Sequence, residues 1–410
     1  MRIRKSADVI IAGAGIMGLH TAFQLKRRAP ELGVRVLERA RAVGQGSTGF
    51  SSAVLRCRYT LPSMVDVAAE GLKIHNNWSD YLELPRPLAS FTQHPILWVM
   101  PETTYQQDVQ RLARHGLNTT VYYSADEVGE RFPALDFSQD ERTGVVQYFV
   151  EEDGGYFDPT AALTDLLTAC RNIGVEVMFN TEIERVHVMD DSTIELVKLS
   201  TGDSVPCGAL VNCTGPWHDK LNDIVGWDND WDIQPARIQV VHKPLVKQDP
   251  AAEDIPAVCD AVNGVYFRPH LQGDHIIIST VRPQDEEERV EEPDDFNTAA
   301  DPEVRQRYLS SLHARIPGLT PRGTVAGYSA LYTVNYADSH PVVGRVHPFT
   351  NYLVANGFTG HGFKLSPVVG AALAQAITGS TTRHFDTRTD WAFLSPNRNP
   401  ITAHRQGVLS

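Results

Sequence analysis

Cysteine is scarce in this chain, whose 410 residues include five: Cys57, Cys170, Cys207, Cys213 and Cys259. They form no C-x-x-C pair and no cluster at zinc-ligand spacing, and their number is odd. These absences argue against a disulfide-stabilised secreted protein and against a cysteine-bound metal, so no metal cofactor is expected. The simplest interpretation is a reduced protein of the cytoplasm.

Positive charge is also in short supply. Lys and Arg number 37 against 50 Asp and Glu, so the formal net charge is −13. This balance disfavours non-specific binding to nucleic acid and attraction to an anionic membrane surface. It leaves open a small anionic ligand that is held by one or two local cations.

Long hydrophobic runs are missing as well. The uncharged stretch 365–382 is interrupted by Ser, Pro, Gly, Gln and Thr, and it predicts a packed helix rather than a membrane span. The apolar residues near the N-terminus are too few for a signal peptide. Neither a membrane nor a nucleic acid is therefore expected as a partner, and the length predicts two domains.

What the chain does have is a glycine pattern next to its N-terminus. An apolar run at 9–12 predicts a buried strand, and Gly13, Gly15 and Gly18 follow it at G-x-G-x-x-G spacing before a predicted helix. Glu38 ends the next apolar run, twenty residues after Gly18, where a carboxylate would bind a ribose hydroxyl. This context predicts dinucleotide binding. The alternative is a βαβ unit with a tight turn and no ligand.

Two further segments are rich in small residues. The loop 44–56 carries so many Gly and Ser residues that its backbone is expected to approach a ligand closely. The Gly-rich turn 357–364 precedes a predicted helix, with Ser366 as its N-cap and Pro367 at its first position. The start of that helix is a second place suited to partial negative charge.

The middle of the chain predicts an antiparallel sheet distinct from the βαβ start, because short strand-like runs follow one another there. An acidic run at 285–295 is expected to be a solvated loop, with a partner-binding segment as the alternative.

Several separated motifs resemble one family. In chain order they are Gly13–Gly18 with Glu38, Gly46–Arg56, Gly155–Pro159, Val211–Trp217, Gly264–Pro269 and Gly357–Lys364. The chain resembles the D-amino-acid-oxidase-like flavoproteins, within them the branch of sarcosine oxidase, glycine oxidase and dimethylglycine dehydrogenase. The resemblance implies FAD rather than NAD as the cofactor, and oxidation of a C–N bond in an amine or amino acid.

The resemblance also implies a mixed α/β (α+β) fold: a Rossmann-like FAD-binding domain and a discontinuous substrate domain with a large antiparallel sheet. The expected FAD-binding segments are 1–89, 152–232 and 325–385. The expected substrate-domain segments are 90–151 and 233–324, and 386–410 is expected to be a surface tail.

The residues that match the family's site motifs are its expected site residues. Arg56 and Lys364 match the pair that holds the substrate carboxylate, and a planar guanidinium fork with a point charge suits that ligand. The other expected catalytic residues are Tyr332, Tyr266, Arg268 and His361. A structural salt bridge is the alternative for Arg56 and core packing for the tyrosines. The expected FAD contacts are Gly13, Gly15, Ile16, Met17, Gly18, Glu38, Arg39, Gly46, Ser47, Thr48, Ser51, Ser52, Thr214, Gly215, Trp217, Gly360, His361, Gly362, Phe363 and Lys364.

Three departures from the family pattern refine these expectations. No Cys precedes Tyr332, and no His occurs in the loop 46–52, so the two known attachment points are missing and FAD is predicted to bind non-covalently. The oxygen-activating Lys of the family is also absent from 273–278, where His275 is the candidate substitute. The electron acceptor, oxygen or another molecule, therefore stays open.

The predicted reaction is hydride transfer from the C–N carbon of a small amine or amino acid, favoured as a secondary or N-methyl amino acid, to flavin N5. The resulting imine then hydrolyses. The alternatives are a flavin dehydrogenase for a 2-hydroxy acid and a non-catalytic FAD-binding subunit of a larger complex. Nothing in the sequence indicates the oligomeric state.

Overall fold

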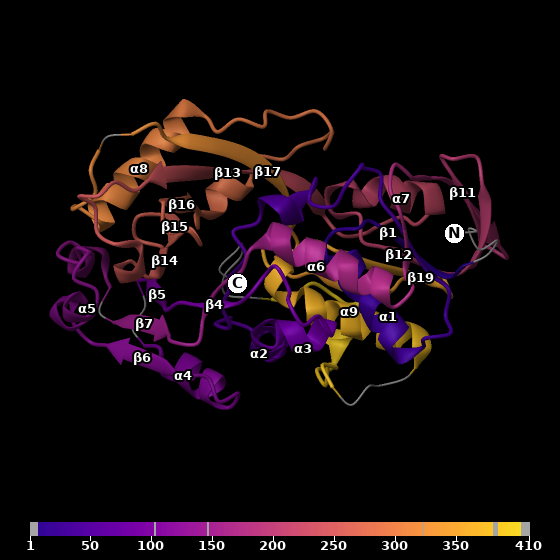
Figure 1. The fold of residues 1–410 in the computed structure, drawn as a ribbon, viewed down its shortest axis with the longest axis horizontal. Helices are drawn as coiled ribbons and strands as arrows, with labels where there is room; N and C mark the ends of the chain where they lie inside the picture. Colours follow the sequence, from indigo (N-terminus) through magenta and orange to yellow (C-terminus); the bar gives the residue numbers. More distant parts are fainter. Residues whose placement is uncertain (1–6, 102–103, 146, 322, 380–383, 403–410) are drawn as a thin grey trace.

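The structure is a computed structural model that describes residues 7–101, 104–145, 147–321, 323–379 and 384–402. Two large sheets organise it. Figure 1 shows one of them on the right with helices α1, α6 and α9, and the other on the left with α4, α5 and α8. This arrangement confirms the mixed α/β fold that the sequence predicts.

The first sheet has a parallel centre. Strand β1 (Ala7–Ala12) pairs in parallel with β2 (Val34–Leu37) on one side and with β12 (Ser204–Asn212) on the other. Apart from the exposed Asp8, the residues of β1 are apolar and buried, because both faces of such a sheet are covered. The remaining strands are β9 (Glu176–Met178), β10 (Ile183–Met189), β11 (Thr193–Leu199), β18 (Val342–Arg345) and β19 (Tyr352–Asn356).

Helices enclose this sheet. Helix α1 (Ile16–Arg28) is buried along most of its length because α9 (Gly362–Thr378) and α6 (Pro159–Asn172) pack on it. The crossing of α1 and α9 is close: a Cβ added at Gly370 would lie 2.7 Å from the His20 carbonyl carbon. The other helices of this half are α2 (Pro62–Asn76), α3 (Trp78–Leu82) and α7 (His218–Val225).

The start of α9 differs from its prediction. The helix begins at Gly362 with His361 at the N-cap, so Ser366 is not the cap and Pro367 lies inside the helix. Proline has no N–H to donate to the carbonyl oxygen of Phe363 four residues earlier. Ser366 Oγ donates to that oxygen instead, at 2.7 Å, and the first turn survives.

The second sheet is almost entirely antiparallel, with β14 and β5 as its parallel pair. Its own core contains Leu97, Val241 and Ile278. In spatial order its strands are β17 (Ala326–Asn335), β13 (Ile233–Pro244), β16 (His275–Thr280), β15 (Val265–Pro269), β14 (Ala257–Asp260), β5 (Ile96–Val99), β7 (Tyr148–Glu151) and β6 (Thr119–Tyr122). The helices beside it are α4 (Gln106–Ala113), α5 (Ala125–Arg131) and α8 (Pro302–Arg315).

Strand β17 connects the two halves. It pairs with β13 from Ile233↔Asn335 to His242↔Ala326, so the segment 325–385 begins inside the second sheet before its later strands join the first. A third, small sheet consists of β3 (Val54–Leu55), β8 (Gly155–Tyr156) and β4 (Thr92–Gln93), in that spatial order. The division of the chain into two discontinuous domains stays a prediction.

The predicted tail is mostly exposed or half-buried over 386–402, but it is anchored to the rest of the protein. Leu394 is fully buried, and Asp386 and Arg398 form ion pairs with Arg28 and Asp338. Hydrophobic burial and paired charges hold the segment, although its composition is polar. Residues 403–410 of the predicted tail lie outside the described part of the chain. In the part that is described, no helix has both the length and the apolar character that crossing a bilayer requires.

Candidate active site

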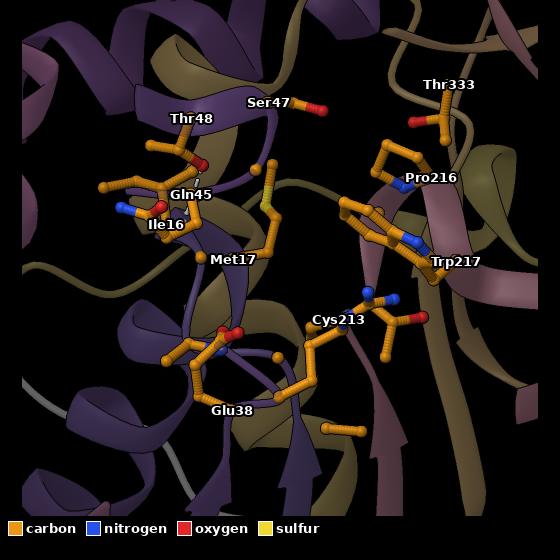
Figure 2. A pocket seen from close by; sticks show the side chains of 18 of the residues that line it. Ile16, Met17, Glu38, Gln45, Ser47, Thr48, Cys213, Pro216, Trp217 and Thr333 are labelled. Carbon is orange, nitrogen blue, oxygen red and sulfur yellow. Dashed lines mark hydrogen bonds between the residues drawn. The ribbon is translucent and has the colours of Figure 1, made fainter. Parts of the chain in front are cut away.

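A cavity of about 410 Å³ opens where β1, β2 and β12 end. This is the edge of a parallel sheet at which nucleotides bind in doubly wound folds. Figure 2 shows Glu38 below, Ile16, Met17 and Thr48 on one side, and Trp217 and Pro216 on the other. The predicted FAD contacts that line it are Gly13, Gly15, Ile16, Met17, Glu38, Arg39, Gly46, Ser47, Thr48, Ser51, Thr214, Gly215, Trp217, Gly360, Gly362 and Phe363. We call it the main cavity.

The glycines of the first motif differ in what surrounds them. Gly13 has a φ of +99°, and a Cβ there would lie 2.4 Å from the Cys213 carbonyl oxygen. Gly18 does not line the cavity; a Cβ on it would lie 1.9 Å from the Gly13 carbonyl oxygen, so its role is close packing. A Cβ on Gly15 would meet just Thr48 Oγ1, at 3.5 Å. The Gly15 backbone is therefore open toward the cavity, at the start of α1.

Glu38 is held by two backbone groups. Its Oε2 accepts from the Ala14 N–H at 2.9 Å, and its Oε1 accepts from the Ala40 N–H at 2.8 Å. Each carboxylate oxygen can accept more than one hydrogen bond, so acceptor capacity is left for a ligand hydroxyl. Together with the open backbone at Gly15, this donor and acceptor set fits the ribose and pyrophosphate of a dinucleotide.

The wall of the main cavity includes an acidic residue that the sequence prediction missed. Asp294 accepts from Trp217 Nε1 at 2.9 Å and pairs with Arg39 at 2.6 Å and Lys220 at 3.2 Å. The Arg39 guanidinium lies over the Trp217 ring, 4.7 Å from its centre. Asp294 belongs to the acidic run, whose sequence gave no signal for these partners because they lie far away in the chain.

Other carboxylates of the acidic run are paired too. Glu288 forms an ion pair with Arg237, Asp285 with Arg307, and Glu292 with Lys220. Glu286 is buried. Most acids of the run are exposed, as the prediction of a solvated loop requires, but several are paired with basic side chains from distant segments.

A second, smaller cavity of about 70 Å³ adjoins the main one. The two share Ser51, Tyr332, Gly360 and Phe363 in their walls. Arg56, Lys364, Tyr266 and Ser52 line just the smaller one, as predicted site residues brought together from distant segments. Its apolar walls, which the sequence prediction missed, include Ile96, Trp98, Cys259, Phe267 and Val281.

Arg56 is buried in this second cavity. Its guanidinium lies 4.4 Å from the centre of the Tyr59 ring and 5.2 Å from that of Trp98, and it donates to the Arg58 carbonyl oxygen. Flat aromatic faces hold a guanidinium in one plane, which suits recognition of a planar carboxylate.

Glu151 anchors the loop that carries Arg56, and sequence reasoning missed it. Its Oε2 accepts from the backbone N–H groups of Cys57 at 2.6 Å and Arg58 at 3.1 Å, and its Oε1 from Trp98 Nε1 at 2.9 Å. Burial raises the pKa of this carboxyl, while the hydrogen bonds and the nearby arginines oppose the rise.

Lys364 lies in the first turn of α9 and is buried. Burial lowers the pKa of its amine well below the ordinary value, and the charge of Arg56 lowers it further. Cys57 and Glu151 act in the opposite direction but do not compensate. The prediction that Arg56 and Lys364 meet at one site therefore agrees with the geometry.

Of the two predicted tyrosines, Tyr332 lines both cavities and Tyr266 lines the smaller one. Burial raises the pKa of Tyr332 well above its ordinary value. Tyr266 donates to Ser52 Oγ at 2.9 Å. Arg268 lines neither cavity: its Nε donates to the Ser52 carbonyl oxygen at 2.9 Å, and its guanidinium lies over Tyr156. The expected contact of Arg268 with substrate is replaced by support of the Ser52 loop.

Two predicted histidines lie away from both cavities. His361 caps α9 and packs edge-on against Tyr59, with ring centres 5.2 Å apart. His275 stacks on His270 and bonds Asp274 through Nδ1 at 2.7 Å, at the start of β16. It does not line either cavity, so the structure gives no support to His275 as a substitute for the oxygen-activating lysine.

Comparison with known proteins agrees with this geometry. The sequence profile of the DAO family, described as FAD dependent oxidoreductase, matches residues 8–376. The chain is 26% identical to the FAD-dependent oxidoreductase domain-containing protein 1 of Bos taurus, over 93% of this chain and 82% of that protein. It is 25% identical to the monomeric sarcosine oxidase of Bacillus sp. (strain B-0618), over 91% of this chain and 93% of that enzyme.

A solved structure shows the same fold. L-proline dehydrogenase from P. horikoshii superposes with a TM-score of 0.79 at 22% identity, over 96% of this chain and 98% of that one. The family match covers most of the chain and includes the motif strand, the segment of Arg56 and the start of α9. The chain therefore belongs to the DAO family of FAD-dependent oxidoreductases.

Proposed function

We propose that this FAD-dependent oxidoreductase oxidises the C–N bond of a small amino acid, with a secondary or N-methyl amine as the favoured class. The observation that carries the proposal is the pair Arg56 and Lys364, buried together in a small apolar cavity that adjoins the main cavity. The names of the related sarcosine oxidases and of L-proline dehydrogenase point to the same substrate class for those proteins.

The main cavity would hold FAD non-covalently. Gly15 and the start of α1 are suited to the pyrophosphate, Glu38 to a ribose, and Arg39 with Trp217 to the adenine end. The flavin ring would then lie toward Tyr332 and Gly360, where the two cavities meet. When bound, FAD supplies the acceptor for the hydride that leaves the substrate carbon.

The residues of the smaller cavity orient the substrate and exclude water. Arg56 offers two parallel N–H groups to the substrate carboxylate, and Lys364 adds a point charge. Trp98, Tyr266 and Tyr332 surround the rest of the ligand with aromatic surface. A volume of about 70 Å³ favours a substrate with a small side chain.

Dioxygen is the first candidate for the electron acceptor, and the cytoplasm is the proposed location. Support for the location comes from the five cysteines, which are free and buried. Support for dioxygen comes from relatives that are named as oxidases.

An anaerobic titration tests the proposal. The FAD-loaded protein is mixed with N-methyl, cyclic and primary amino acids and, in parallel, with 2-hydroxy acids, while the flavin absorbance is followed. Bleaching by an amine supports the proposal, and bleaching by hydroxy acids alone overturns it in favour of the hydroxy-acid dehydrogenase. Flavin that no ligand bleaches, in protein that copurifies with a partner, favours a non-catalytic subunit. Admission of air then measures how fast dioxygen restores the colour.

A further inference from the structure

Lys364 shares one small cavity with a second cationic side chain, and both are buried. Arg56 faces the same small cavity from the segment after β3, and Glu151 of β7 is the buried acid nearby. Among the described residues, no carboxylate lies within ion-pair distance of Lys364 Nζ. The other titratable side chains that line the cavity are Cys259, Tyr266 and Tyr332.

The ionisable groups nearest to Lys364 either stay uncharged or are held by other residues. Burial raises the pKa of the Cys57 thiol and of the Tyr332 hydroxyl, so both stay neutral at neutral pH. Glu151 already accepts hydrogen bonds from Cys57, Arg58 and Trp98. Arg58 has its own partner, since it pairs with Asp108 at 3.0 Å.

Two cations in one apolar cavity cost more than one, and a lysine can give up its charge while an arginine cannot. Burial and the nearby charge of Arg56 both lower the pKa of the Lys364 amine. Loss of the Lys364 proton would relieve this repulsion and leave Lys364 with an available lone pair beside Arg56.

We propose that Lys364 is the base that takes the ammonium proton from the amino-acid substrate. This inference rests on the proposed function and adds a catalytic role to a residue expected to bind the carboxylate. The substrate enters as a zwitterion with its carboxylate on Arg56. The lone pair of Lys364 Nζ forms a new N–H bond, and the N–H electrons of the substrate return to its nitrogen as a lone pair. The proton moves, no electrons are lost, and the total charge of the site is unchanged.

The transfer serves both reacting groups. An amine must have a free lone pair before hydride can leave its carbon, because that pair becomes the second bond of the C=N product. The newly charged Lys364 also adds a cation beside the substrate carboxylate, where it is now compensated. One proton thus activates the amine and completes the carboxylate site.

Ligands with and without an amine should differ in the number of protons taken up from solvent when they bind. An amino acid brings the proton for Lys364 with it. A carboxylic acid anion without an amine brings none, so its binding must draw about one proton from the solvent. This uptake requires a pH above the lowered pKa of Lys364. It disappears as the pH falls through that value, because the lysine is then charged before the ligand binds.

Isobutyrate and 2-aminoisobutyrate form a matched pair of probes, since they differ by one amino group and the second has no α-hydrogen to be oxidised. Titration calorimetry of the FAD-loaded protein at pH 8, in two buffers of different ionisation enthalpy, measures the protons exchanged with each. We expect uptake of about one proton with isobutyrate and about none with 2-aminoisobutyrate. Isobutyrate binding without uptake from pH 7 to 9 would overturn the proposal, as would failure of both probes to bind at tens of millimolar.

Two variants keep the test decisive. Lys364→Arg preserves the positive charge but cannot accept a proton, so isobutyrate should bind without uptake. Its kcat/KM at pH 7 should fall on the order of 100-fold, the usual scale of general-base catalysis, and rise about tenfold per pH unit as free amine accumulates. A pH profile unchanged from that of the parent protein contradicts the assignment. If Lys364→Arg does not fold, Lys364→Met supplies the same uptake measurement.

Flavin bleaching tests the proposed function, and proton uptake tests the role of Lys364, so the two can fail independently. If no amine bleaches the flavin but isobutyrate binding takes up a proton, the substrate proposal fails while the neutral state of Lys364 stands. If amines bleach the flavin but isobutyrate takes up no proton, amine oxidation stands and the base assignment fails.

Discussion

Asp294 accepts a hydrogen bond from Trp217 Nε1 at 2.9 Å, which joins the acidic run to the wall of the main cavity. The same carboxylate pairs with Arg39 and Lys220. One residue of the run therefore lines the cavity beside Arg39 and Trp217, where the adenine of FAD is proposed to lie.

Loss of the Asp294 contacts with Arg39, Lys220 and Trp217 should speed the exchange of FAD. We expect Asp294→Asn to increase the rate of FAD dissociation by roughly two- to fivefold, because exposed ion pairs contribute about 0.2–1 kcal/mol each. Added salt should have a smaller effect on the variant than on the parent protein. Stopped-flow release of FAD measures both. Asp295→Asn is the matched control, since its exposed side chain is next in the chain, and equal rates for the two variants would contradict the role of Asp294.

Glu38 should contribute to FAD affinity through its charge. Glu38→Gln keeps the shape but weakens hydrogen bonds that a carboxylate accepts, and such bonds are worth about 1.5–3 kcal/mol. The Kd of the apoprotein for FAD, measured by flavin fluorescence, should rise roughly 10- to 100-fold. Glu184→Gln, at an exposed position of β10, should leave the Kd unchanged. A normal Kd in Glu38→Gln would mean that this carboxylate only braces the Ala14 turn.

Alanine substitutions at Gly13 and Gly15 should separate the structural role of the glycine motif from its role in FAD binding. Gly13→Ala places a side chain at φ +99° and 2.4 Å from a backbone oxygen, so the folded state should lose about 3 kcal/mol or more. Gly15→Ala meets just Thr48 Oγ1 at 3.5 Å, so the apoprotein should melt near the parent temperature.

Gly15→Ala should weaken FAD binding although it leaves the apoprotein stable. The methyl group of Gly15→Ala points into the main cavity, where the pyrophosphate is proposed to lie, and the Kd for FAD should rise at least about tenfold through the lost close approach. Melting curves of the apoprotein and FAD titrations of both variants provide the comparison. Unaltered FAD binding in Gly15→Ala would place the pyrophosphate elsewhere.

Arg56 should act on ligands with a carboxylate. Arg56→Met removes the guanidinium fork from a buried site, so KM for an amino acid should rise roughly 10- to 100-fold, as expected for loss of a charge-assisted pair. An amine of similar size without a carboxylate should be affected far less. Arg114→Met, at an exposed position, is the control. Equal losses for both kinds of ligand would show that Arg56 serves the structure of its loop instead.

The flavin should leave the protein on denaturation. Covalent FAD would stay with the acid-precipitated polypeptide, whereas non-covalent FAD appears in the supernatant. We expect all of the yellow colour in the supernatant after precipitation with trichloroacetic acid. Flavin that remains in the pellet would require an attachment point that the family comparison does not suggest.

The local parts of this site were predictable from sequence because they depend on neighbouring residues. The turn at Gly13 and the position of Glu38 follow from motif spacing, whereas the meeting of the distant Arg56 and Lys364 was predicted only through the family resemblance. Glu151 was not predictable, because its partner Cys57 lies 94 residues away and nothing near either residue indicates the contact. The same holds for Asp294, which composition alone assigned to a solvated loop.

The start of α9 shows a second limit of sequence reasoning. A Ser-Pro pair resembles the first residues of a helix, so local preference placed the cap at Ser366. The tertiary packing of α9 on α1 and the bond from Ser366 Oγ to Phe363 instead extend the helix to Gly362. That extension places Lys364 in the first turn and brings Gly362 and Phe363 to the main cavity.

Strand β17 gives the site a mechanical property. It is bonded along its length to β13, while Leu331 accepts from Ser47 Oγ at 2.6 Å and Thr333 accepts from the Thr359 N–H at 2.8 Å. One continuous piece of backbone is thus clamped to both halves of the molecule beside the two cavities. The strand fixes the spacing between the substrate side and the flavin side. The two halves cannot separate there without breaking hydrogen bonds to the backbone of β17.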